Sequence, residues 1–180
     1  GRLAGLVTLR DETALTYERQ LDEIARGLVL AFREADQVAA GPDLAGMFTD
    51  GGAAALPGGF SAGLAARIAV NPAVDPAQGG SILRIRDGGI NGANYDYNPG
   101  GFAAFVDRLR ETAANLSAPF AADPLAQLPA GTGLDVFAGN SVGWLEERRA
   151  AALTDADYAG TVVERAREAL SNEVGVNMDD

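Results

Sequence analysis

The sequence predicts a mainly α-helical protein with a small β component, an α+β chain dominated by long helices. Three observations lead to this prediction. A long amphipathic pattern near the N-terminus has helical counterparts near the C-terminus, the segments between them are rich in glycine and proline, and strands and helices do not alternate as in a βαβ fold. The 180 residues are enough for one domain with its own core.

The first helix is expected from about residue 10 to residue 39. Apolar or aromatic residues recur along it at heptad spacing, and further apolar residues widen the stripe to the breadth of a bundle helix. The heptad positions are Ala14, Tyr17, Leu21, Ile24, Leu28, Ala31, Ala35 and Val38. Charged residues occupy the opposite face, where Asp22 and Arg26 have the spacing of an i,i+4 ion pair. Gly41-Pro42 is expected to end this helix.

A loop-rich module of mixed structure is predicted for residues 41–137. Its strand is expected near residues 67–71, where apolar and polar residues alternate before Pro72. Ser81 to Asp87 could form a strand or a helical turn, and residues 87–101, rich in glycine and asparagine, form a loop.

The second half of the module begins with a helix at about residues 102–118. A linker rich in proline, glycine and alanine follows at 121–133, and residues 134–137 predict a short strand.

Two shorter helices are predicted at the C-terminal end, at about residues 141–153 and 155–172. Thr154 would cap the second of them, with Asp157 as its capping-box partner. Together, residues 1–40 and 138–180 would form a helical, rod-like part.

The composition excludes several classes of site. The chain has 25 acidic residues and 14 arginines, a net charge of −11, and no cysteine, histidine or lysine. Disulfides, thiolate or imidazole metal sites, a Ser-His-Asp or Cys-His nucleophile and a Schiff-base lysine are therefore impossible. The negative charge also argues against nucleic acid and anionic membranes as partners. These facts predict a protein that is not an enzyme and has no cofactor.

The Gly/Asn-rich loop is the first segment that could carry chemistry. Gly88 to Asp96 has the composition of a calcium or phosphate loop, but a dinucleotide fingerprint needs a strand before it and a helix opening within it, and a calcium nonapeptide needs repeats. A structural turn is therefore favoured. Calcium binding at Asp87 or Asp96 is kept as part of an alternative function.

Dense carboxylates occur only once more, at Glu146-Glu147 and at Asp155 and Asp157. Adjacent helical residues point in different directions, and acids in a first turn complement the helix dipole, so a hydrolase pair is not favoured. Trp144 is expected to pack against a helix. No catalytic, cofactor-binding or metal-binding residue is predicted.

Four segments, taken in order, resemble the flagellar hook-associated protein 1 family, the hook–filament junction proteins. They are residues 3–11 running into 17–25, residues 41–48, residues 68–72 and residues 171–180. The sequence departs from the family after Phe32, where asparagine and histidine are usual, and at Glu173-Val174, where serine is usual.

The resemblance implies a structural subunit of the bacterial flagellum that acts by self-assembly and not by catalysis. It implies an extracellular location at the hook–filament junction, reached through type III export without a cleaved signal peptide. The implied partners are copies of itself in a ring, hook protein, the next hook-associated protein and an export chaperone.

The chain is expected to be a central fragment lacking both polymerising termini, and for that reason monomeric. The alternative function is a ligand- or calcium-binding module of a secreted or surface protein, with residues 87–101 as its loop. Residues 73–140 match no motif of the family.

Overall fold

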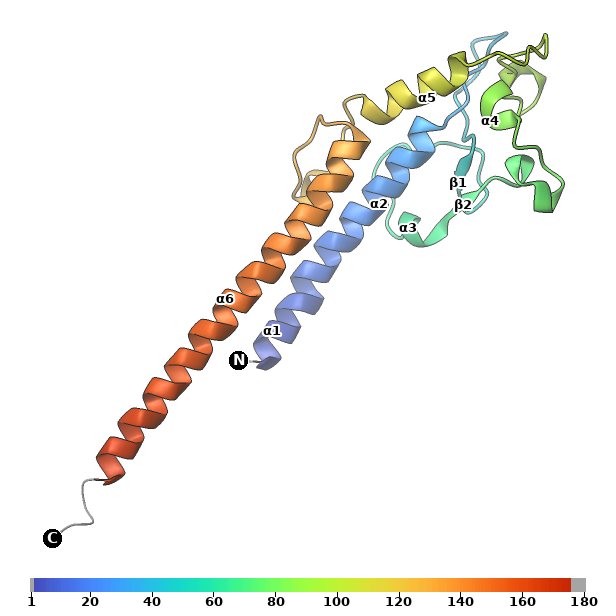
Figure 1. Cartoon of the computed structure of the whole chain (residues 1–180). Coiled ribbons are helices and arrows are strands. Elements are labelled where there is room, and N and C mark those ends of the chain that lie inside the picture. Colours follow the sequence, from blue (N-terminus) through green and yellow to red (C-terminus); the bar gives the residue numbers. More distant parts are fainter. Residues whose placement is uncertain (1, 176–180) are drawn as a thin grey trace.

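Two long helices lie side by side and carry a head of short elements at one end (Figure 1). The computed structural model describes residues 2–175. About 58% of the chain is helical, and a two-stranded sheet is the β component, which confirms the predicted fold class. The helices are α1 (Arg2–Thr8), α2 (Ala14–Ala31), α3 (Leu64–Arg67), α4 (Arg84–Asp87), α5 (Asp107–Ser117) and α6 (Leu134–Gly175), and the strands are β1 (Phe48–Asp50) and β2 (Ile68–Val70).

The N-terminal helix begins and ends earlier than predicted. A π-helical turn, Leu9–Thr13, joins α1 to α2, and the helix stops at Ala31, so the prediction of a helix to residue 39 is wrong. Ala35 and Val38 fit the heptad spacing but lie in an irregular segment. The cause is a tertiary contact, because Glu34 and Leu44 exchange two backbone hydrogen bonds of 2.8 Å and draw the chain out of the helix.

The C-terminal part is one helix, α6, and not two. The predicted break at Thr154 is wrong, because its hydroxyl donates to the carbonyl oxygen of Ala150 and leaves the helix intact. The strand predicted at residues 134–137 is also wrong, since these residues form the first turn of α6. Alanines at 150–152 favour continuation of the helix more than one capping threonine favours a break.

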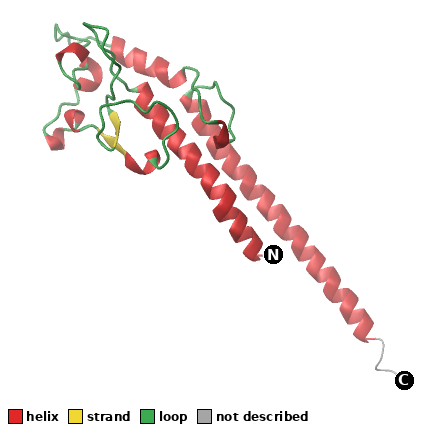
Figure 2. Ribbon diagram, turned by 180° about the vertical axis from the view of Figure 1, so that it is seen from behind, coloured by secondary structure: helices red, strands yellow, loops and turns green. Residues whose placement is uncertain are grey.

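The head contains the predicted strand, β2, paired antiparallel with β1 so that Thr49 faces Ala69. The strand β1 was not predicted. Of the two alternatives for residues 81–87, the structure has the helical turn, α4. The helix predicted at 102–118 is present as α5, but it begins at Asp107, so the prediction is wrong for residues 102–106. Viewed from behind, loops connect most of these short elements (Figure 2).

The core lies around the C-terminal half of α2, which contacts α3, α5, α6 and the 3₁₀ turn Pro124–Ala126. Val29, Leu64 and Phe137 are among its fully buried apolar side chains. Gly27 lies against α6, since a Cβ at this position would lie 2.5 Å from Cδ1 of Leu134 and would displace that side chain. The described core therefore sits at the head end of the helix pair.

Candidate interaction surface

The charged face of α2 is largely buried. The guanidinium of Arg26 bonds Glu23 at 2.7 Å and not Asp22, so the predicted i,i+4 pair is wrong. The carboxylate of Asp22 instead accepts hydrogen bonds from the backbone N–H groups of Gly63 and Ala65, both 2.8 Å long. This face is polar because it binds the chain segments that cross it.

A second buried polar contact joins α2 to α6. The side-chain amide of Gln20 donates to the carbonyl oxygen of Ala126 at 2.9 Å, and its oxygen accepts from the hydroxyl of Ser141 at 2.8 Å. Gln20 and Ser141 are both buried. Gln20 lies seven residues before Gly27 in α2, and Ser141 lies seven residues after Leu134 in α6. The Gln20–Ser141 and Gly27–Leu134 contacts therefore fix an antiparallel register between the two helices.

The Gly/Asn-rich loop encloses a carboxylate of the chain itself. Glu34 is fully buried and accepts hydrogen bonds from the N–H groups of Ile90 and Asn91, at 3.1 and 2.9 Å, and from the side-chain amide of Asn91 at 2.9 Å. The guanidinium of Arg108, on α5, lies 3.6 Å from the same carboxylate. The loop thus resembles an anion site whose donors are already used by Glu34.

The two aspartates of this loop also have partners within the head. Asp87 forms an ion pair with Arg86 at 2.7 Å and accepts from Asn98 at 2.8 Å, and Arg86 holds the pKa of this carboxyl below its usual range. Asp96 accepts from the backbone N–H of Asn98. Within residues 2–175, no three Asp or Glu side chains lie close enough together to hold a metal ion.

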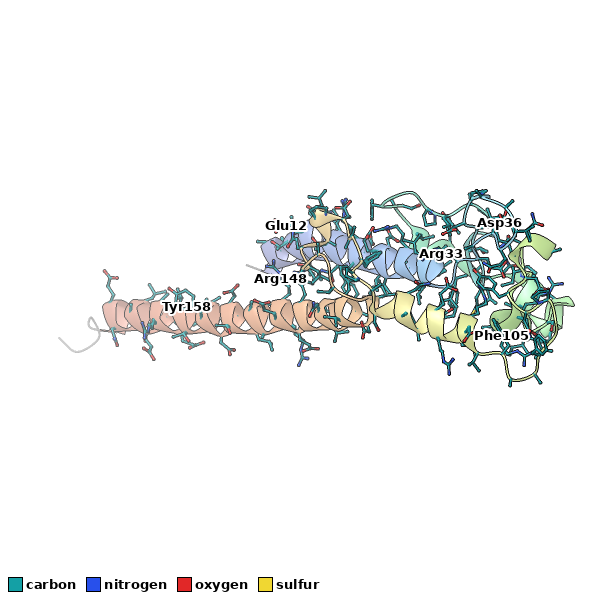
Figure 3. All side chains as sticks on the ribbon, turned by 90° about the horizontal axis from the view of Figure 1, so that it is seen from above. Glu12, Arg33, Asp36, Phe105, Arg148 and Tyr158 are labelled. Carbon is teal, nitrogen blue, oxygen red and sulfur yellow. The ribbon has the colours of Figure 1, made fainter. Side chains whose placement is uncertain are left out.

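The carboxylates of α6 do not come together. Glu146 pairs with Arg149 one turn away, and both side chains are well exposed. Trp144 is half-buried, and the guanidinium of Arg148 lies 5.2 Å from the centre of its ring. This stacking lies where α6 last contacts the N-terminal helix. Glu12, in the π-helical turn, and Arg148 lie near each other there (Figure 3).

Beyond Trp144, the described side chains of α6 are all exposed. Leu153, Val163 and Leu170 expose 57%, 48% and 63% of their surface, and Tyr158 projects from a bare stretch of helix (Figure 3). The apolar side of this stretch comprises Leu145, Ala152, Ala156, Ala159, Val162, Val163, Ala166 and Leu170, which share a face at helical spacing. We call these eight residues the distal α6 face.

The start of the first helix is uncovered as well. Leu3, Leu6 and Leu9 are exposed to between 54% and 80%, although α6 runs past them in the opposite direction. Extending the register of the Gln20–Ser141 contact places Arg2 level with about Tyr158. About 16 residues of α6 therefore project beyond α1. Figure 1 shows α6 continuing past the start of α1.

Sequence patterns alone did not find Gln20, Glu34 or Arg108, whose partners come from distant segments. No family model matches the chain, and no curated protein and no solved structure shows significant similarity to it. Between residues 2 and 175, no helix is both long enough and apolar enough to cross a membrane. The most distinctive functional feature of the described chain is thus a pair of uncovered helical faces.

Proposed function

We propose that this protein is a structural subunit of the bacterial flagellum that works by self-assembly at the hook–filament junction. The observation that carries the proposal is the distal α6 face, together with the exposed leucines of α1. Apolar faces of this length, projecting from a small folded head, are typical of surfaces that other protein segments cover.

The resemblance to hook-associated protein 1 supports the same proposal. Residues 3–11 and 17–25 lie along the first helix, and residues 68–72 begin in β2 beside it. Of the fourth segment, residues 171–175 end α6, while residues 176–180 lie outside the described part of the chain. Residues 41–48, the second segment, run through irregular chain to the first residue of β1. The other matching segments follow the helix pair and the strand beside it, where an assembly protein needs its surfaces.

The proposal includes a location and a set of partners. The subunit would be exported through the type III route, without a cleaved signal peptide, to the extracellular junction. There it would contact copies of itself, hook protein and the next hook-associated protein, after leaving an export chaperone. The absence of cysteine suits an exported protein.

A gene deletion tests this function. A strain without the gene should assemble hooks but no filaments, and should not swim. Complementation with the gene should restore filaments, whereas a gene carrying Val163→Glu should restore them poorly, because a charge enters the distal α6 face. Thr161→Glu, on the opposite side of the same helical turn, is the matched control. Normal filaments in the deletion strain would refute the proposed function.

The ligand- or calcium-binding alternative depends on the loop at residues 87–101. Because Glu34 already uses the loop's N–H donors and Arg86 pairs with Asp87, that loop offers an incoming ion few free groups. Calorimetry with calcium is expected to show no binding, and binding at millimolar or tighter affinity that Asp87→Asn abolishes would favour the alternative.

A further inference from the structure

We propose that two copies of this chain associate in solution through the distal α6 face, with their α6 helices antiparallel and centred near residue 161. Each α6 would then lie between the partner's α6 and the partner's α1, as in a four-helix bundle. This replaces the expectation of a monomer, which considered only segments outside the chain. The inference concerns the free chain and does not depend on the flagellar function.

The lengths of the uncovered segments support this arrangement. The projecting part of α6 is about 16 residues, or roughly 24 Å, long. The uncovered start of the first helix, from α1 through the π-helical turn, covers 12 residues. Pairing about residue 161 brings the partner's α1 and π-helical turn level with about residues 164–174, within the part of α6 that projects beyond α1.

Side-chain sizes along the face favour the same register. Antiparallel pairing about residue 161 sets Ala152 opposite Leu170 and Ala159 opposite Val163 of the other copy. A small residue then meets a larger one in each layer, which lets two helices pack closely without voids. Ala156 meets Ala166 between these layers.

The charges beside the face favour antiparallel over parallel pairing. A parallel, in-register pair would set Arg149 against Arg149, Asp155 against Asp155 and Glu173 against Glu173 of the other copy. The antiparallel pair sets Arg149 opposite Glu173 at both ends. Arg149 now pairs only with the exposed Glu146, a contact weak enough to exchange.

The arrangement has a consequence for assembly. Subunits in a ring all point the same way, so an antiparallel pair is a state of the free chain. It would keep the apolar faces covered until another partner replaces the second copy, and so limit nonspecific aggregation.

Light scattering after size exclusion gives the first test. The chain should elute at twice its mass of 18.5 kDa, and Val163→Glu should elute at the mass of one chain. Thr161→Glu should keep the mass of the pair, because position 161 lies away from the face. Val163 is exposed in the single chain, so its replacement leaves the core intact, and unchanged hydrogen exchange at the amides of residues 88–95 in the head would verify this.

The orientation is tested by one spin label, because the chain has no cysteine of its own. A label on Asn172→Cys, exposed and on the side of α6 opposite the face, should lie about 33 Å along the axis from its counterpart in the antiparallel pair. A parallel pair would bring the labels within about 20 Å. A single-chain mass at high micromolar concentration, the shorter distance, or equal masses for Val163→Glu and Thr161→Glu would each overturn the proposal.

Discussion

Replacing Glu34 by glutamine should destabilise the head more than any other change of one atom in the described chain. The carboxylate is fully buried, accepts three hydrogen bonds of 2.9 to 3.1 Å from Ile90 and Asn91, and lies 3.6 Å from Arg108, which is itself buried. Glutamine has nearly the same shape. It presents an N–H₂ group where the loop needs an acceptor, and it removes the charge opposite Arg108.

The size of the effect follows from these contacts. A hydrogen bond to a charged group contributes about 1.5–3 kcal/mol, and at least one becomes a contact between two donors. Removing one partner of a buried ion pair costs about 3–5 kcal/mol, because the other charge stays buried without compensation. We expect Glu34→Gln to lower the free energy of unfolding by about 3–5 kcal/mol, a large part of the roughly 5–15 kcal/mol of a typical domain.

Urea denaturation followed by circular dichroism measures this loss, and hydrogen exchange at the amides of residues 88–95 localises it. The control is Asp43→Asn, because Asp43 also forms an arginine pair, with Arg33, but an exposed one expected to contribute less than about 1 kcal/mol. If Glu34→Gln costs no more than Asp43→Asn, the buried carboxylate does not hold the loop. A double-mutant cycle with Arg108→Met should give a coupling energy between the two charges of at least about 0.5 kcal/mol.

Three further predictions concern the helix contacts, the loop and α6. Gln20→Leu should lower the free energy of unfolding by about 1–3 kcal/mol in urea titrations, because it leaves the hydroxyl of the buried Ser141 without its acceptor; a loss below about 0.5 kcal/mol would contradict this. Arg86 lowers the pKa of Asp87 below 3.8 in the folded chain. The stabilisation of the fold by this ion pair is therefore complete above pH 3.8 and is lost as the pH falls through the folded pKa. In a plot of melting temperature against pH, Asp87→Asn should accordingly make the fall at acid pH shallower. Thr154→Ala should leave helicity unchanged or raise it, since alanine favours a helix interior by up to about 0.7 kcal/mol, whereas loss of an N-cap would cost about 1 kcal/mol and lower the melting temperature.

The sequence predicted elements better than it predicted their ends. Periodicity located the first helix, the helix at α5 and the strand at β2, because each depends on nearby residues. It placed the end of the first helix at residue 39, eight residues after Ala31, because Ala35 and Val38 continue the heptad spacing. In the structure the helix has ended before Glu34, whose carboxylate binds the Gly/Asn-rich loop. The break at Thr154 failed for a local reason: a threonine can bond to the carbonyl four residues earlier and remain inside a helix.

The candidate surface was predictable in part. The apolar positions of α6 can be found from spacing, but the sequence does not tell whether a stripe is buried in its own chain or left uncovered. That depends on the register set by Gln20 with Ser141 and by Gly27 with Leu134, contacts between residues more than 100 positions apart. The buried role of Glu34 was likewise beyond local patterns, since its donors lie 56 and 57 residues away.

The two ends of the helix pair are stabilised differently, and this difference connects the fold to the proposed assembly. At the head, charged side chains of α2 and Glu34 bind backbone groups of the crossing loops, contacts that depend on geometry and leave little freedom. Beyond Trp144, the described residues of α6 make hydrogen bonds within the helix and exposed i,i+3 ion pairs, such as Glu164 with Arg167, which contribute a few tenths of a kcal/mol each. In proteins, most of the stability of a helix comes from the packing of its amphipathic face and not from helix propensity. The distal α6 face therefore gains most of its order from whatever covers it, so that association and completion of the helix are coupled. Because the head is held by its own contacts, the distal part of α6 could become ordered on association while the register between α2 and α6 stays unchanged.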